Sequence, residues 1–274
     1  MHPGGVRQFF PVDNAPVSGY DKHNDSNEVT AMPEANRPES PFARSAAMLG
    51  ADAMTRLQSA RVAVFGVGGV GGYVCEALVR SGVGTLDVFD KDDVSVTNLN
   101  RQIIALHSTI GQDKVSVLAA RMRDFNPDVV INEHKVFYLP ENADDFDLSQ
   151  YDYVVDAVDT VAAKIELAVR CVQLNVPLIA AMGAGNKLDP SKLQIADVYK
   201  TSVCPLARAM RTTLRKKGVK RLTVAYSTEE PLRPVEAIDN GGMRKDVPGS
   251  MAFVPSAMGL LIASHVVRQI ALSR

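Results

Sequence analysis

A run of glycines, Gly66-Val-Gly-Gly-Val-Gly71, separates a short apolar segment from a segment with helical spacing. Glycine lets the backbone turn tightly there and brings N–H groups close to a phosphate, at the positive end of the helix dipole. Asp90 follows Gly71 by 19 residues, at the end of a second apolar segment, where a carboxylate can bind ribose hydroxyls. The candidate nucleotide-binding residues are Gly66, Gly68, Gly69, Gly71 and Asp90. This pattern leaves open the choice between NAD and ATP, and a tight turn without a ligand is the alternative.

The segment after Asp90 is polar and charged where a dehydrogenase would normally enter its next helix. It offers a second carboxylate, an amide and a guanidinium, and a lysine and a further carboxylate follow near later elements. These candidates are Asp92, Asn98, Arg101, Lys114 and Asp159. Cationic groups bind anionic oxygens and magnesium takes oxygen ligands, so the set favours a triphosphate with its magnesium. The alternatives are a surface ion pair for Arg101, a solvated side chain for Lys114 and a helix cap for Asp159.

The elements that position these residues alternate between strand and helix. Apolar segments predict strands at residues 61–66, 85–90, 129–131, 151–156 and 177–181. Helical spacing predicts helices at 69–80, 115–125, 160–175 and 250–271. Residues 193–199 and 221–226 indicate later, antiparallel strands. The predicted fold class is therefore α/β: a Rossmann-like, mostly parallel sheet with helices on both faces and additional antiparallel strands.

The composition is that of an ordinary globular protein. Of 274 residues, 46% are apolar and 22% charged, and 30 basic residues nearly balance 31 acidic ones. This balance excludes a uniformly basic nucleic-acid-binding protein and a chain that is disordered throughout, but it permits a local basic face. The cysteines, Cys75, Cys171 and Cys204, form no CxxC pair. Their spacing argues against a disulfide framework and a structural zinc site, and it favours a cytoplasmic compartment.

Residues 1–41 differ from the rest of the chain, because they hold 6 of the 15 prolines and few apolar residues. Such a segment buries too little apolar surface to offset the entropy of ordering. We therefore expect a flexible leader at 1–41 and one domain over 42–274. We expect no integral membrane span, because the most apolar segment, residues 256–267, is shorter than the roughly 20 residues that a span needs and contains His265.

The motifs taken together resemble those of the ThiF/MoeB adenylyltransferases, which are relatives of the ubiquitin-activating enzymes. The resemblance rests on the glycine run, Asp90-Lys-Asp-Asp-Val-Ser-Val-Thr-Asn-Leu-Asn-Arg-Gln102, Lys114 and Asp156-x-x-Asp159. It extends from Phe42 to the C-terminus. It implies a homodimer that uses Mg-ATP to adenylate a carboxylate and releases pyrophosphate, as an adenylate-forming ligase does.

The resemblance also implies a role for each matching residue. The glycines, Asp90 and Asp92 would hold the nucleotide, Asn98, Arg101 and Lys114 would contact its phosphates, and Asp159 would bind Mg²⁺. Arg44, in Pro41-Phe-Ala-Arg-Ser-Ala-Ala-Met-Leu-Gly50, matches the arginine of the family's first helix. That arginine is expected to reach the ATP of the partner subunit. The catalytic residues implied are Arg44, Arg101, Lys114 and Asp159.

Residues 182–190, 198–211 and 224–231 look like one branch of the family, whose members dehydrate threonylcarbamoyladenosine in tRNA. Members of that branch adenylate the threonyl carboxylate, and the carbamoyl group then closes on the activated carbonyl and expels AMP. A tRNA substrate agrees with a concentration of basic residues at 200–221, because phosphate backbones select a positive face. The candidate RNA-binding residues are Arg208, Arg211, Arg215, Lys216 and Lys217. A solvated basic helix is the alternative.

Other interpretations stay open. Cys204 departs from what we expect of that branch. We favour a small residue at the start of a helix with no chemical role. As a nucleophile it would instead suit activation of the C-terminus of a ubiquitin-like sulfur carrier, with a sulfur-transfer protein as partner. A non-catalytic nucleotide-sensing or RNA-binding scaffold is a third interpretation. The branch also suggests a monovalent cation, K⁺ or Na⁺, near Ser227–Glu229. The apolar C-terminal helix is expected to support dimerisation or to touch a membrane peripherally.

Overall fold

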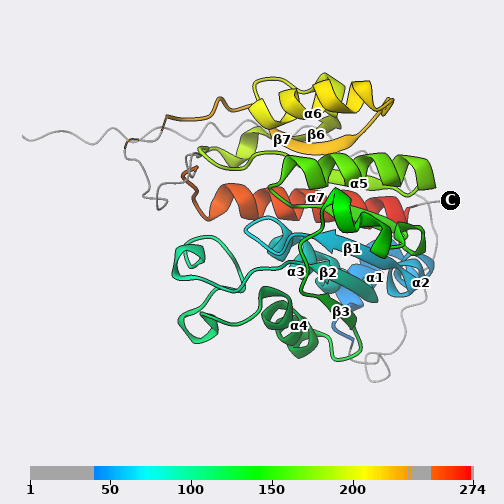
Figure 1. Cartoon of the computed structure of the whole chain (residues 1–274). Helices are drawn as coiled ribbons and strands as arrows, with labels where there is room; N and C mark the ends of the chain where they lie inside the picture. The colour runs from blue at the N-terminus through cyan, green and yellow to red at the C-terminus, as the bar shows by residue number, and fades with distance from the viewer. Residues whose placement is uncertain (1–39, 234, 236–247, 273–274) are drawn as a thin grey trace, which may run out of the picture. The chain divides into compact units, whose positions relative to one another are not determined.

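The computed structural model describes residues 40–233, 235 and 248–272. All but the last two residues of the predicted leader, 1–41, lie outside the described residues. The described chain alternates between strands and helices (Figure 1). The strands are β1 (Arg61–Phe65), β2 (Thr85–Phe89), β3 (Val130–His134), β4 (Tyr153–Asp156), β5 (Leu178–Ala181), β6 (Leu193–Asp197) and β7 (Thr223–Ser227). The α-helices are α1 (Ala43–Leu49), α2 (Ala51–Ser59), α3 (Gly71–Arg80), α4 (Lys114–Phe125), α5 (Val161–Leu174), α6 (Pro205–Lys216) and α7 (Phe253–Ala271). Short 3₁₀ turns lie at Val96–Asn98, His107–Thr109, Pro140–Asp145, Leu148–Gln150, Pro190–Lys192 and Val198–Lys200.

The strands form one sheet in the order β3-β2-β1-β4-β5-β7-β6. Neighbouring strands from β3 to β7 are parallel, and β6 is antiparallel to β7. The predicted fold class is thus confirmed. The two late strands, β6 and β7, are antiparallel to each other, as predicted. β7 also pairs in parallel with β5, because it lies between β5 and β6, and so it extends the parallel part of the sheet.

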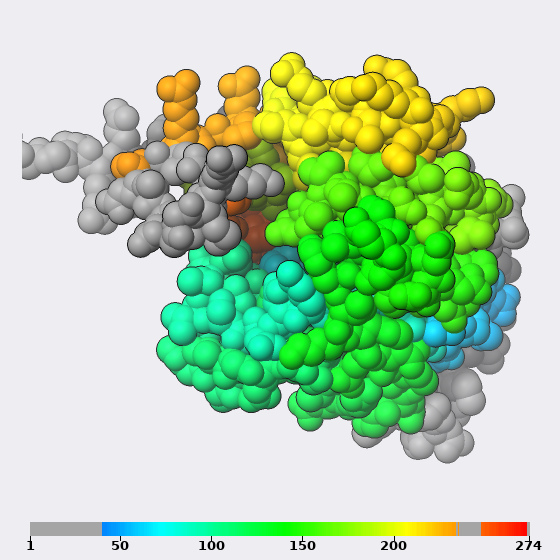
Figure 2. Space-filling model, viewed as in Figure 1, coloured from blue at the N-terminus to red at the C-terminus, as the bar shows by residue number. Residues whose placement is uncertain are grey.

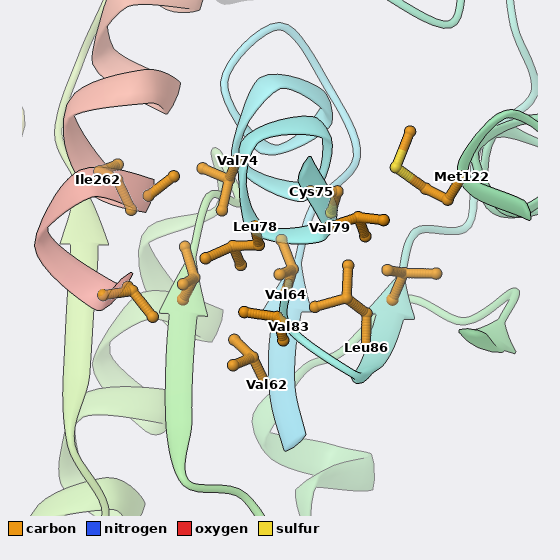
Figure 3. Close-up of a cluster of buried hydrophobic side chains, with 14 of the residues drawn as sticks. Val62, Val64, Val74, Cys75, Leu78, Val79, Val83, Leu86, Met122 and Ile262 are labelled. Atoms are coloured by element: carbon orange, nitrogen blue, oxygen red, sulfur yellow. The ribbon is translucent and has the colours of Figure 1, made fainter. Parts of the chain in front are cut away.

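Helices cover both faces of the sheet because successive strand residues point to opposite sides. Val62 and Val64 of β1 point to the face covered by α2, α3, α4 and α7, and Ala63 and Phe65 point to the face covered by α5. α6 packs farther along that second face, over β7. Figure 3 shows the first face, with side chains of α3, α4 and α7 gathered around the two valines of β1. Because the strands from β3 to β7 are parallel, their carboxyl ends lie along one edge of the sheet.

α7 is long and apolar enough, by length and composition, to cross a membrane. In the domain it packs as a core helix, because Met258, Ile262 and Val266 are buried. It also approaches α3 closely at Gly259, where an added Cβ would lie 2.5 Å from the carbonyl oxygen of Val70. The packing of this helix therefore accounts for much of its apolar character.

Candidate active site

The glycine run forms a tight turn between β1 and α3. Gly66 has a φ of 91°, and an added Cβ would lie 2.6 Å from the carbonyl oxygen of Ala157. An added Cβ at Gly71 would lie 1.8 Å from the carbonyl oxygen of Gly66, so only glycine fits at either position. The N–H groups of Gly68, Gly69 and Val70 have no hydrogen-bond partner among the described residues. They lie just before the N-terminus of α3 and are available to an anion.

Asp90 connects this loop to the segment that follows β2. Its Oδ2 accepts a hydrogen bond of 2.7 Å from the N–H of Val67, and its Oδ1 accepts one of 2.9 Å from the N–H of Asp92. Lys114 is only 6% exposed, and its ammonium lies 3.0 Å from Oδ2 of Asp92 and 3.8 Å from Oδ1 of Asp90. The three predicted residues therefore meet beside the glycine loop, and Lys114 is not a solvated surface lysine.

Asn98 and Arg101 lie on the turn after β2. The Asn98 side chain is buried, and its Oδ1 accepts the N–H of Ser95 at 3.0 Å, while its Nδ2 has no partner among the described residues. Nη1 of Arg101 donates to the carbonyl oxygen of Thr97 at 2.7 Å. An added Cβ at Gly69 would lie 3.5 Å from Cγ of Arg101, so the arginine lies against the glycine loop. Arg101 forms no ion pair with any acid in the described part of the chain, which removes the surface-pair alternative.

Gln102 lies beside the glycine loop and is a candidate site residue that the sequence motifs did not single out. Its side chain is 7% exposed, and its Oε1 is buried without a hydrogen-bond partner in the described structure. Its Nε2 lies 3.9 Å from where a Cβ of Gly68 would be. A buried amide with an unused acceptor normally has a partner, so Gln102 belongs to the lining of the candidate site. The feature of the sequence that could have identified Gln102 is its position directly after Arg101.

The two aspartates at the end of β4 differ completely in environment. Asp156 is buried, and its Oδ1 accepts a hydrogen bond of 2.9 Å from Nζ of Lys164, which also donates to the carbonyl oxygen of Ala181 at 2.7 Å. Burial raises the pKa of Asp156, although the Lys164 ammonium opposes this effect. Lys164 is thus a second residue that sequence reasoning missed, and it ties the carboxyl ends of β4 and β5 together.

Asp159 is exposed, and the hydroxyl of Thr160 lies 3.3 Å from its Oδ1. The residue that caps α5 is Thr160, and no side chain donates or accepts at that cap. The structure therefore does not support the alternative role of Asp159 as a helix cap. Its carboxylate takes part in no ion pair within the described residues and is free to bind a cation.

Arg44 lies far from this glycine loop. It is exposed near the start of α1, two residues after Phe42. Phe42 packs edge-on against Phe125 with ring centroids 6.2 Å apart, and it lies near Gly82, just past the C-terminus of α3. The glycine loop precedes the other end of α3, which at 10 residues is about 15 Å long. The structure therefore does not bring Arg44 to the nucleotide site of its own chain.

The predicted RNA-binding residues lie on or beside α6, which forms an outer margin of the second face (yellow, Figure 2). Arg211 is partly buried, and its Nη1 donates to the carbonyl oxygen of Thr201 at 3.2 Å, so it anchors the start of the helix segment. The Arg215 guanidinium lies over the ring of Tyr199, 5.3 Å from its centroid. The exposed basic residues among the candidates are Arg208, Arg215, Lys216 and Lys217.

Cys204 is the residue before the first turn of α6, and only 3% of its surface is exposed. A buried thiol is a poor nucleophile for a protein-sized partner.

The segment predicted to hold a monovalent cation is an ordered turn. The carboxylate of Glu229 accepts N–H groups from Leu188 at 3.0 Å and Asp189 at 2.9 Å, and Oγ of Ser227 accepts the N–H of Glu229 at 3.1 Å. Nζ of Lys187 donates to the carbonyl oxygen of Glu229 at 2.8 Å.

A cavity of about 680 Å³ lies at the opposite edge of the sheet. It is lined near the amino ends of β4, β5 and β7 by residues such as Tyr153, Leu178 and Thr223. In parallel α/β sheets ligands bind outside the carboxyl ends of the strands, and the glycine loop lies at that end. We therefore place the candidate site at the glycine loop and not at this cavity.

Comparison with known proteins identifies relatives of this chain. The sequence matches the ThiF family over residues 42–273. It is 45% identical over 235 residues to the tRNA threonylcarbamoyladenosine dehydratase of Bacillus subtilis, covering 82% of this chain and 92% of that protein. The Escherichia coli dehydratase is 33% identical over 247 residues, covering 83% of this chain and 92% of that protein. The crystal structure of the E. coli tRNA N6-threonylcarbamoyladenosine dehydratase in complex with ATP matches the present fold with a TM-score of 0.77 at 33% identity, covering 85% of this chain and 94% of that one.

Proposed function

The chain belongs to the ThiF family, and from this premise we propose that it is an ATP-dependent enzyme that dehydrates threonylcarbamoyladenosine in tRNA. The observation that carries the proposal is the gathering of polar groups around the glycine loop. N–H groups and the Nδ2 of Asn98 without a partner among the described residues lie at one edge of the sheet, together with Arg101, Lys114 and the exposed carboxylate of Asp159. Such a set binds an anionic ligand that carries a metal ion.

The residues at this edge divide the binding of ATP among them. The N–H groups of Gly68, Gly69 and Val70 donate hydrogen bonds to phosphate oxygens, and the carboxylate of Asp90 accepts hydrogen bonds from the ribose hydroxyls. Lys114 and Arg101 neutralise the negative charge that builds up on the phosphates as the bond to the leaving pyrophosphate breaks. Asp92 holds Lys114 in place through the 3.0 Å contact.

Asp159 fits the requirements of a magnesium ligand. Mg²⁺ in nucleotide sites keeps several waters and binds through one or two carboxylates together with phosphate oxygens. Asp159 supplies one exposed carboxylate that forms no ion pair within the described residues. When bound, Mg²⁺ neutralises phosphate charge. Asp156 is a poor second ligand because its carboxylate is buried against Lys164.

The chemistry needs positioning more than a protein nucleophile. The threonyl carboxylate of the nucleoside attacks the α-phosphate of ATP, and pyrophosphate leaves. The carbamoyl group of the same nucleoside then attacks the activated carbonyl, and AMP leaves with one carboxylate oxygen. Because this second step is intramolecular, it gains from proximity and requires no catalytic cysteine. That agrees with the burial of Cys204.

Arg208, Arg215, Lys216 and Lys217 support an RNA substrate, because they expose positive charge in a stretch without acidic residues. Phosphate contacts of this kind position an RNA without reading its sequence. Arg211 contributes to this surface indirectly, by fixing the start of α6 through Thr201.

We place Arg44 in the site of a partner subunit. It is exposed on α1 and lies near the end of α3 that is opposite its own glycine loop. A second copy of the chain would therefore supply this arginine to each site. The exposed Met48 of α1 and Leu260 of α7 offer apolar surface for such a homodimer. A tRNA substrate and a homodimer suit a cytoplasmic enzyme. The alternative role for the exposed apolar face of α7 is peripheral contact with a membrane.

The second candidate function is activation of a ubiquitin-like sulfur carrier, with a sulfur-transfer protein as partner. Its one supporting feature is Cys204 at the start of α6. It requires that Cys204→Ser abolish transfer while sparing ATP–pyrophosphate exchange.

The proposal is tested by measuring AMP formation from Mg-ATP by the purified protein. We expect AMP release with tRNA that carries threonylcarbamoyladenosine and none with the same tRNA lacking the modification. AMP release that responds instead to a ubiquitin-like protein, and is abolished in Cys204→Ser, would favour the second candidate.

A further inference from the structure

Lys187 lies in the loop after β5, at the same edge of the sheet as the glycine loop, and the proposed function gives it no role. The residue is only 3% exposed. It forms no ion pair with a carboxylate in the described part of the chain, and its Nζ donates to a backbone carbonyl, that of Glu229, at 2.8 Å. Burying an ammonium in this way is unfavourable unless oxygen atoms replace the water it loses.

The carbonyl that receives Lys187 belongs to a turn fixed at several points. The N–H of Glu229 donates to Oγ of Ser227, which is fully buried, at 3.1 Å. The carboxylate of Glu229 reaches back to the lysine's own loop and accepts the N–H groups of Leu188 and Asp189. The carboxylate of Glu229 in the turn after β7 thus binds the loop after β5, and the ammonium of Lys187 in that loop binds the turn. The two segments therefore hold each other in place.

We infer that the Lys187 ammonium is a tethered cation, which fills the position where a free K⁺ or Na⁺ was expected beside Ser227–Glu229. A carbonyl oxygen that coordinates a potassium ion takes the place of a hydration water, and a buried ammonium uses the same oxygen in the same way. The positive charge at this turn is already supplied by the chain, so the residues present do not fit a free monovalent cation. Lys187 is thus a positioning residue for the two loops.

Charges near the ammonium agree with this role. Burial lowers the pKa of Lys187, while Cys204 and Glu229 act to raise it. Glu229 itself is held charged, because the N–H groups of Asp189 and Leu188 lower the pKa of its carboxyl. The loop pair therefore keeps one positive and one negative group close together without a direct salt bridge between the described side chains.

The test compares the full-length protein in KCl, NaCl, NH₄Cl and choline chloride at one ionic strength, with the thermal midpoint Tm as readout. The wild type is expected to have the same Tm in all four salts. Lys187→Ala removes the ammonium and leaves space, so its Tm is expected to fall in choline chloride and to recover in KCl or NH₄Cl. Lys187→Met fills much of that space without a charge, and its Tm is expected to fall without recovery in any salt. Lys192→Ala, an exposed lysine nearby, is the matched control and should behave like the wild type.

A wild-type Tm that rises specifically with K⁺ or Na⁺ would overturn the inference, because a free cation would then bind in spite of Lys187. A Lys187→Ala protein with the wild-type Tm, or with a lowered Tm that no salt restores, would overturn it as well. If Lys187→Ala does not fold in choline chloride, refolding in KCl decides: recovery supports the tethered cation, and failure contradicts it. ATP–pyrophosphate exchange measured in the same salts is a second readout. Because Tm needs no tRNA, failure here is distinguishable from failure of the proposed function.

Discussion

The ammonium of Lys114 lies 3.0 Å from the carboxylate of Asp92, and it is buried where α4 begins. Asp92 in turn donates its N–H to Asp90, which accepts the N–H of Val67 in the glycine loop. One series of hydrogen bonds thus runs from the start of α4 to the candidate phosphate site. The sequence predicted Lys114, Asp92 and Asp90 as candidate site residues. Which of them contacts which follows only from the fold.

Lys114→Met should remove the cation from this series while keeping most of the buried side-chain volume. We expect ATP–pyrophosphate exchange to fall by about 10²-fold or more, as when one group that stabilises transition-state charge is removed. The control is Lys135→Met, because Lys135 pairs with Asp93 and Asp113 on the exposed side of the same region. Exchange that survives in Lys114→Met would show that Lys114 is not catalytic.

Arg44 should act on the ATP of the partner subunit. Arg44→Ala and Lys114→Ala are each expected to be inactive alone. Mixed and allowed to exchange subunits, they should recover about one quarter of the wild-type rate, because half of the dimers are mixed and each carries one complete site. No recovery, with subunit exchange shown by a tag on one variant, would place Arg44 outside the active site.

The buried pair of Asp156 and Lys164 should be a stability determinant. Lys164→Met leaves the carboxylate of Asp156 buried and unpaired, which typically costs about 3–5 kcal/mol. Equilibrium unfolding in urea measures this loss. The double variant Lys164→Met with Asp156→Leu should lose less stability than Lys164→Met alone, since no charge is left uncompensated. Additive losses would contradict a coupled pair.

The carboxylate of Asp87 predicts how stability depends on pH. Burial raises the pKa of Asp87, but hydrogen bonds from Arg61, Asn132 and His134 outweigh this effect and hold it below the ordinary value. A pKa that is lower in the folded state means that this group stabilises the fold above the pKa of the unfolded chain, about 3.9. The contribution disappears as the pH falls below that value through the folded pKa.

Comparison of the wild type with Asp87→Asn between pH 7 and pH 3 checks this prediction. The difference in unfolding free energy is expected to be constant near neutrality and to shrink in acid. A difference that grows as the pH falls would contradict the assignment.

The exposed cations of α6 should govern the salt dependence of tRNA binding. Replacing Arg215, Lys216 and Lys217 together by alanine should weaken binding and reduce the slope of log affinity against log salt by about one for each phosphate that is no longer neutralised. Arg211→Ala should instead lower Tm, because Arg211 is bonded to Thr201. Filter binding at several salt concentrations measures the slopes. Unchanged slopes in the triple variant would show that α6 does not bind the RNA.

Most strands and helices could be predicted, because strands such as β1 and β5 are short apolar runs and helices such as α3 and α7 follow an apolar pattern. The short helix α2 was not predicted. The parallel pairing of β7 with β5 could not be predicted, because the two strands are far apart in the sequence. The same limit applies to Lys164 and Lys187. A lysine in an apolar helix or in a loop gives no sequence signal of burial, since its partners include the backbone carbonyls of Ala181 and Glu229.

The grouping of Asp90, Asn98, Arg101 and Lys114 near the glycine loop could be predicted, because a motif fixes both the type and the spacing of these residues. Gln102 was missed because a glutamine beside a motif has no chemistry of its own until its burial next to Gly68 is seen. Arg211 has the spacing of a surface cation and is nevertheless partly buried, because Thr201 offers it oxygen acceptors. The spacing of residues predicts which face of a helix a side chain lies on, but it does not predict which other residues pack against that face.

The most direct test is the mass of the modified nucleoside. tRNA that contains threonylcarbamoyladenosine is incubated with the protein and Mg-ATP, digested and analysed by mass spectrometry. We predict a nucleoside lighter by one water, formed only with ATP and absent with Lys114→Met. An unchanged nucleoside mass, with protein that demonstrably binds ATP and with intact modified tRNA, would contradict the proposed function.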